Sequence, residues 1–104
     1  MDFEVTWSPQ VRDDLNEIAA YIAKDSPRYA SAVVDKILAT GRGLHLLPWR
    51  GLVVPEIDSE NCRELFIHEY RLIYEIHGEA VRVIAVIHGR RLLGSVSGRL
   101  PDPA

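Results

Sequence analysis

YRLIYEIHGEAVRVIAVIH, residues 70–88, is the stretch that decides the fold. It holds two β-prone runs, and the break His77-Gly78-Glu79-Ala80 between them is typical of a hairpin connection. Both runs are apolar on both alternating faces, which predicts central strands covered by a helical layer. The sequence therefore predicts a sheet with this hairpin near its middle.

More strands lie on the N-terminal side of this hairpin. LVVPEI (52–57) and CRELFIH (62–68) have the same β-prone character, and FEVTW (3–7) alternates as a first strand. Strands that follow one another closely in the chain most simply form an antiparallel meander. We expect residues 52–88 to form one.

Two helices are predicted between the first strand and this meander. Ser8-Pro9 and Ser26-Pro27 each give a helix start, with a side-chain cap before a proline at the first helical position. Asp13, Asp14 and Glu17 lie toward the start of the first helix, where its dipole favours negative charge. Two apolar stripes follow the helical period: Val11, Leu15, Ile18, Ala19 and Ile22, then Ala30, Val33, Val34, Ile37 and Leu38, continuing toward Leu44 and Leu47. Stripes so closely linked predict an antiparallel helical hairpin.

The predicted class is α+β, in the order β-α-α-β-β-β, with the helical hairpin packed on one face of a mainly antiparallel sheet. At 104 residues the chain has the length of one domain. We assign that domain to residues 1–92 and expect the tail at 93–104, rich in Gly, Ser and Pro, to be poorly ordered unless something binds it.

Composition excludes several classes. No apolar run approaches the roughly 20 residues that span a bilayer, and no signal peptide is readable at the N-terminus. Cys62 is the only cysteine, so no intramolecular disulfide is possible and the cytoplasm is the expected compartment. The histidines lack zinc-ligand spacing, and no nucleotide-binding glycine motif or nucleophile elbow occurs. We expect neither metal nor cofactor.

The net charge is −3, which is not typical of a protein held to nucleic acid by bulk electrostatics. Residues 1–60 hold six basic and ten acidic groups, whereas residues 61–104 hold six basic and five acidic groups. All six basic groups in the second part are arginines, which favour planar, bidentate contact with carboxylate or phosphate.

The order and spacing of several phrases resemble the RelE/ParE superfamily of toxins. These phrases span most of residues 3–92: Ser8-Pro9, Ser26-Pro27, Leu47-Pro48 with Gly51, Val54-Pro55-Glu56, Cys62-Arg63-Glu64-Leu65, Tyr70-Arg71-Leu72-Ile73-Tyr74 and Ile87-His88-Gly89-Arg90-Arg91. The resemblance implies the toxin of a type II toxin–antitoxin pair, neutralised by an antitoxin whose disordered segment folds over it. RelE-like members cut messenger RNA on the ribosome, and ParE-like members poison DNA gyrase. The shared scaffold does not choose between these targets.

A metal-free ribonuclease needs a base, a cation for the phosphate and an acid. If the chain is RelE-like, the resemblance assigns these roles to Arg71 and His88, with Arg90 beside them. Side chains alternate along a strand, so Arg82, His88 and Arg90 share a face if the strand runs straight. The other candidate binding residues are Arg63, Tyr70, Tyr74, Arg82 and Arg91. For Tyr74 and His88, core packing and structural hydrogen bonding are the competing interpretations.

The acidic balance favours the ParE-like interpretation. A RelE-like nuclease is expected, from the resemblance, to be basic and rich in lysine around its site. Here the only lysines, Lys24 and Lys36, lie in the helical hairpin. A third hypothesis is an inactive module that only binds antitoxin. In every case we expect the second face of the sheet to be open and lined by arginines, ready for a partner segment with acidic and apolar residues that folds as it binds.

Overall fold

The computed structural model describes residues 2–89, 96 and 98–101. Its elements are β1 (Glu4–Trp7), α1 (Pro9–Ala23), α2 (Pro27–Arg42), the 3-10 turns η1 (Gly43–His45) and η2 (Pro48–Arg50), β2 (Leu52–Val53), β3 (Cys62–Ile67), β4 (Tyr70–His77) and β5 (Ala80–His88). The sheet order is β1-β5-β4-β3-β2. β1 runs parallel to β5 and the other neighbours are antiparallel, so the predicted class and element order are confirmed.

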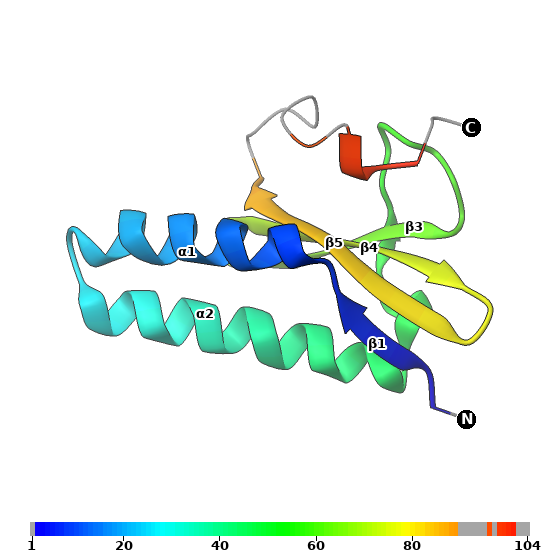
Figure 1. Cartoon of the computed structure of the whole chain (residues 1–104), viewed down its shortest axis with the longest axis horizontal. Coiled ribbons are helices and arrows are strands. Elements are labelled where there is room, and N and C mark those ends of the chain that lie inside the picture. Colours follow the sequence, from blue (N-terminus) through cyan, green and yellow to red (C-terminus); the bar gives the residue numbers. More distant parts are fainter. Residues whose placement is uncertain (1, 90–95, 97, 102–104) are drawn as a thin grey trace.

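The two helices form the predicted hairpin. Figure 1 shows α1 and α2 side by side and joined by a short turn at one end. Leu44 is fully buried as predicted, but Leu47 is 64% exposed because α2 ends at Arg42 and the following 3-10 turns change the direction of the chain. The buried side chains of the helical layer pack on one face of β4 and β5, and the residues of this core cluster are Val11, Ile18, Val33, Ile37, Leu44, Ile67, Tyr70, Leu72, Tyr74, Ile76, Val81, Val83 and Val86.

Only one of the two predicted serine caps forms a hydrogen bond to the start of its helix. Ser26 Oγ accepts a hydrogen bond from the Tyr29 amide at 3.1 Å and caps α2. Ser8 makes no such bond, because its hydroxyl contacts the side chain of Gln10 and its backbone amide remains in the sheet, donating to Val83 O at 2.8 Å. The predicted side-chain cap of α1 is therefore wrong.

A β-bulge interrupts the ladder between β4 and β5. Ile73 pairs with Ala85 but Tyr74 pairs with Val83, so Ile84 is an extra residue on β5. The bulge shifts the alternation by one residue, and Arg82 and His88 consequently lie on opposite faces of the sheet. The prediction that they share a face assumed a straight strand and is wrong.

Part of the second face of the sheet is covered by the chain itself. A second core cluster there contains Val54, Ile57, Cys62, Ile73, Ile84, Ala85, Ile87 and Val96, with Leu100 packed against it. Val54 and Ile57 belong to the loop after β2, whereas Val96 and Leu100 belong to the C-terminal segment, which Figure 1 shows in red on the side away from α2. The expectation of a wholly open face is thus wrong. Of the predicted tail, Val96 and Leu100 pack on this cluster, and residues 93–95, 97 and 102–104 lie outside the described residues.

Among the described residues, no helix is long and apolar enough to cross a membrane. Nor do those residues gather three side chains that could hold a metal ion.

Candidate functional site

Arg71 lies on the second face of β4, and two glutamates hold its guanidinium. Its Nε donates to Glu64 Oε1 at 2.6 Å, and Nη1 and Nη2 donate to the two carboxylate oxygens of Glu56 at 3.0 Å each. The Arg71 and Glu64 side chains are only 7% and 5% exposed, whereas that of Glu56 is 46% exposed. The bidentate bond to Arg71 lowers the pKa of Glu56, and the same contact raises the pKa of Arg71.

This arrangement has a direct consequence for anion binding. One guanidinium faces two carboxylates, so the Arg71 cluster carries an excess of negative charge rather than a free cation. A phosphate could reach Arg71 only after the bidentate bond to Glu56 was broken. Arg71 is therefore occupied by the chain itself.

His88 lies on the opposite face from Arg71. It pairs across the strands with Tyr70, which belongs to the core under the helices, whereas Arg71 pairs with Ile87 in the second core. The His88 and Tyr70 rings meet edge to face with centroids 5.6 Å apart, and His88 Nε2 is 3.4 Å from Glu69 Oε2. The structure thus does not bring Arg71 and His88 together, and Arg90 and Arg91 fall outside the described residues.

The remaining candidate arginines differ in their surroundings. Arg63 donates to the backbone oxygens of Glu60, Gly51 and Trp49 at 2.8, 3.0 and 3.2 Å, and its guanidinium lies 5.2 Å from the centre of the Trp49 ring. It therefore fixes the loops on either side of β2. Arg82 is exposed on the second face, across from Glu75.

The two candidate tyrosines have structural surroundings. Tyr74 is fully buried, and its hydroxyl donates to Pro48 O at 2.7 Å and accepts from the Gly51 amide at 3.1 Å. A Cβ atom on Gly51 would lie 2.2 Å from that hydroxyl, so the close approach needs glycine. Burial raises the pKa of Tyr74 and also that of Tyr70, whose residue is 7% exposed.

Asp14 is a residue that the sequence interpretation assigned only to the helix dipole. It is 8% exposed, and its carboxylate accepts from the Val86 amide at 3.0 Å and from both terminal nitrogens of Arg99 at 2.7 and 3.0 Å. This ion pair fastens the C-terminal segment to α1. Its position in the sequence could have indicated that it is buried. Asp14 comes three residues after Val11 and four before Ile18, so all three lie on the buried side of the helix.

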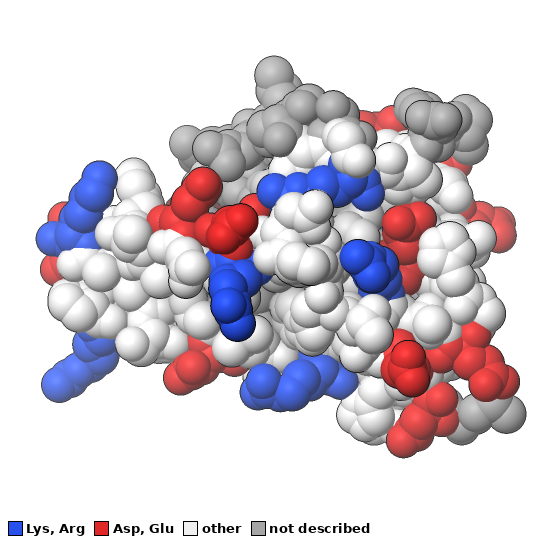
Figure 2. Space-filling view, viewed as in Figure 1, with Lys and Arg blue, Asp and Glu red and all other residues white. Residues whose placement is uncertain are grey.

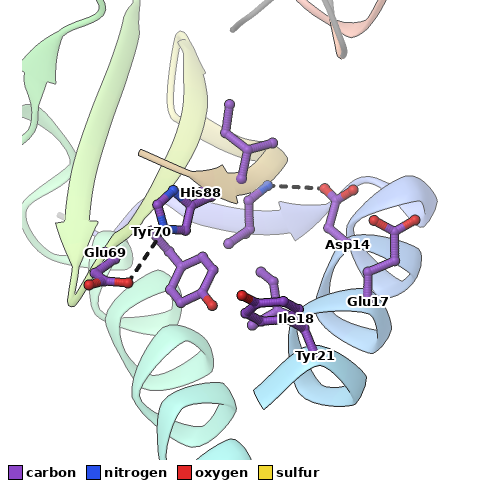
Figure 3. A pocket seen from close by; sticks show the side chains of 9 residues that line it. Asp14, Glu17, Ile18, Tyr21, Glu69, Tyr70 and His88 are labelled. Atoms are coloured by element: carbon purple, nitrogen blue, oxygen red, sulfur yellow. Dashed lines mark hydrogen bonds and ion pairs between the residues drawn. The ribbon is translucent and has the colours of Figure 1, made fainter. Parts of the chain in front are cut away.

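A pocket of about 410 Å³ opens where α1 meets the ends of β4 and β5. We call it the end pocket, and Figure 3 shows the side chains that line it. Asp14, Glu17 and Tyr21 reach it from α1, while Tyr70 and His88 reach it from the sheet. Its lining is therefore acidic, aromatic and aliphatic, with His88 at one side.

The face of the molecule seen in Figure 2 does not have the basic surface that is typical of nucleic-acid binding. In Figure 2 basic and acidic side chains are interspersed, and the residues coloured there form no continuous basic patch on this face. The described residues thus offer buried arginine–carboxylate contacts and an end pocket with acidic side chains rather than a basic cleft.

Comparisons with known proteins give one family match and several structures with a similar fold. The family model described as "ParE toxin of type II toxin-antitoxin system, parDE" matches residues 5–93. A search of curated protein sequences gives no match.

Three solved structures are similar. The chromosomal ParDE toxin–antitoxin system of P. aeruginosa has a TM-score of 0.67 and 17% identity, over 83% of this chain and 95% of that one. A mutant of the E. coli toxin RelE in the free state has a TM-score of 0.66 and 13% identity, over 95% and 94%. The toxin–antitoxin complex RelBE2 from Mycobacterium tuberculosis has a TM-score of 0.55 and 26% identity, over 85% and 99%.

Proposed function

The chain belongs to the ParE toxin family of type II toxin–antitoxin systems, and on that premise we propose that it is a toxin that binds its target rather than a ribonuclease. The proposed target is DNA gyrase, and the proposed neutralising partner is the cognate antitoxin. Both act in the cytoplasm, which is therefore the proposed location of this chain.

The occupied state of Arg71 is the observation that supports binding over RNA cleavage. A ribonuclease of this scaffold needs a free cation for the phosphate and a proton-transfer group beside it. Here Glu56 and Glu64 hold the cation, and His88 is on the other side of the sheet. Because side chains on opposite faces cannot act on one phosphate, these residues support no cleavage site.

Charge supports the same choice. The chain has a net charge of −3, and ribosomal RNA would repel such a protein unless a basic patch compensated. A protein target such as gyrase makes no such demand, because protein interfaces rest on apolar contact and local charge complementarity.

Two assays with purified toxin test the proposal. We expect the toxin to inhibit gyrase supercoiling and the cognate antitoxin to restore it. We also expect intact messenger RNA when the toxin is added to translating ribosomes. Normal supercoiling at a large molar excess of folded toxin refutes the gyrase target, and cleavage within translated codons refutes the non-nuclease mechanism.

Growth separates these outcomes from the hypothesis of an inactive module. Strong expression without the antitoxin is expected to arrest growth, and co-expression with it is expected to restore growth. Unrestricted growth despite abundant folded protein would leave only a scaffold role.

A further inference from the structure

We propose that an acidic, aromatic groove at the end of the sheet binds a basic segment of the cognate antitoxin. The groove, which we call the end groove, is lined by Glu17, Tyr21, Tyr29, His68, Glu69 and Tyr70. The inference rests on the proposed antitoxin partner and assigns it a contact surface and a charge.

The end groove is continuous across two hollows. The end pocket, of about 410 Å³, adjoins a second hollow of about 190 Å³ toward the turn between the helices. The two share Tyr21, Glu69 and Tyr70, so one surface runs from α1 past the β3–β4 turn. A surface of that form suits several successive side chains of a polypeptide better than a single small ligand.

Exposed aromatic rings form its apolar part. Tyr21 is 69% exposed and Tyr29 is 49% exposed, and the ring of Tyr29 lies edge to face with His68 at 6.0 Å. Large aromatic side chains left in solvent beside a hollow are typical of protein interfaces, where the ring is buried and the hydroxyl finds a partner. Figure 3 shows Tyr21 and Tyr70 facing one another across the end pocket.

The described residues place exposed carboxylates along the groove. Glu17 and Glu69 are exposed at its rim, and Asp25 lies in the smaller hollow. Glu69 contacts only His88 within ion-pair distance among the described residues, and Glu17 forms no ion pair with them. A binding segment that brings arginine or lysine could pair with these two carboxylates.

The chain already binds its own cations at two places along this surface. Arg99 forms its paired contact with Asp14 beside the end pocket, and the Lys24 ammonium lies 5.7 Å from the centre of the Tyr21 ring. Both the carboxylate and the aromatic part of the groove therefore accept cationic groups in this structure. We therefore expect the partner segment to be basic.

The proposal reverses the charge that the sequence predicted for the partner. Six arginines after residue 60 favoured an acidic segment. In the structure, however, Arg63, Arg71 and Arg99 are held by oxygens of the chain itself. Arg82 is exposed on the second face of the sheet, and Arg90 and Arg91 fall outside the described residues. Among the residues that the structure describes, the exposed charges that line the end groove are those of carboxylates.

The test measures the dissociation constant of the toxin for the product of the adjacent reading frame. The variant is Glu17→Gln/Glu69→Gln, and the matched control is Glu60→Gln/Glu79→Gln, which removes two exposed carboxylates from the other end of the strands. All four residues are exposed, so both proteins are expected to fold, and thermal unfolding verifies this. We expect about tenfold weaker binding for the groove variant, a shallower salt dependence, and less than about threefold change for the control.

Further results separate this inference from the proposed function. Equal loss in variant and control, or no loss in either, overturns the end groove while leaving the toxin–antitoxin pair intact. Unchanged antitoxin binding with lost gyrase inhibition would assign the groove to the target and also overturn the inference. Self-association of the toxin that the groove variant abolishes would assign the groove to a second copy of the chain, and the inference would again be overturned. A wild-type toxin that does not bind the antitoxin overturns both proposals.

A second variant checks the aromatic wall independently of charge. Tyr21→Ala is expected to weaken antitoxin binding by about tenfold, because an exposed tyrosine loses its burial on association. Binding within about twofold of wild type would remove the aromatic part of the proposal.

Discussion

Replacing Arg71 with methionine removes the cation from between Glu56 and Glu64. Glu64 would then be left at a site where its side chain is 5% exposed, without the guanidinium that it contacts. Removing one partner of a buried ion pair typically costs about 3–5 kcal/mol of unfolding free energy. Glu56→Gln is expected to cost about 1 kcal/mol or less, because the Glu56 side chain is 46% exposed and water can replace the lost contact.

The double variant Arg71→Met/Glu64→Gln provides the decisive comparison. It leaves no unpaired buried charge, so it is expected to be more stable than Arg71→Met alone, which is the signature of a coupled pair. Urea unfolding followed by the fluorescence of Trp7 and Trp49 measures all four proteins at pH 7. An Arg71→Met cost below about 1 kcal/mol, or a double variant no more stable than the single one, would refute this reasoning.

The pH dependence of the same proteins gives an independent check. The contact with Arg71 lowers the pKa of Glu56 below its ordinary value of 4.5. A carboxylate with a lowered pKa stabilises the folded state above its unfolded pKa, and that contribution is lost as the pH falls through the folded pKa. The stability difference between wild type and Glu56→Gln is therefore expected to be full above about pH 5 and to close on acidification. A difference that widened in acid would contradict it.

Three further predictions concern stability and reactivity. Asp14→Asn is expected to lower the free energy of unfolding by about 2 kcal/mol, because the paired bond to Arg99 loses its charge; an unchanged urea midpoint would contradict this. Gly51→Ala is expected to cost about 2 kcal/mol, because the new Cβ would lie 2.2 Å from the Tyr74 hydroxyl; calorimetry showing wild-type thermal stability would exclude such a clash. Burial raises the pKa of the Cys62 thiol to about 12, so a disulfide reagent at pH 8 is expected to label it only after unfolding, and rapid labelling of the native protein would argue otherwise.

Periodicity was sufficient to predict the main elements of the fold. The apolar stripes predicted the helical hairpin, and the double-sided runs at 70–88 predicted the two central strands. Both predictions depend on local sequence, where spacing of 3.6 or two residues reports directly on burial. The end of α2 was missed because Leu47 continues the apolar pattern into turns that direct it to solvent.

The candidate site was harder to predict because it depends on register and distant pairing. VIAVI at 83–87 is apolar throughout, so nothing in its pattern marks Ile84 as the bulged residue. The Asp14–Arg99 pair joins residues 85 positions apart, and no local rule connects them. The resemblance assigned Arg71 to phosphate, whereas its contacts in the structure depend on Glu56, which arrives from a loop.

The bulge at Ile84 also affects where β5 can tolerate an insertion or a deletion during evolution. Loss of that one codon would leave Ala85, Val86, Ile87 and His88 on their present faces, because the bulge places Ile84 and Ala85 on the same side. An insertion or deletion elsewhere in β5 would turn the rest of the strand over and exchange the residues that face the two core clusters. Ile84 is thus the position where the strand can lose a residue without turning over. Alignments that count along β5 without locating the bulge will transfer residue roles to the wrong side of the protein.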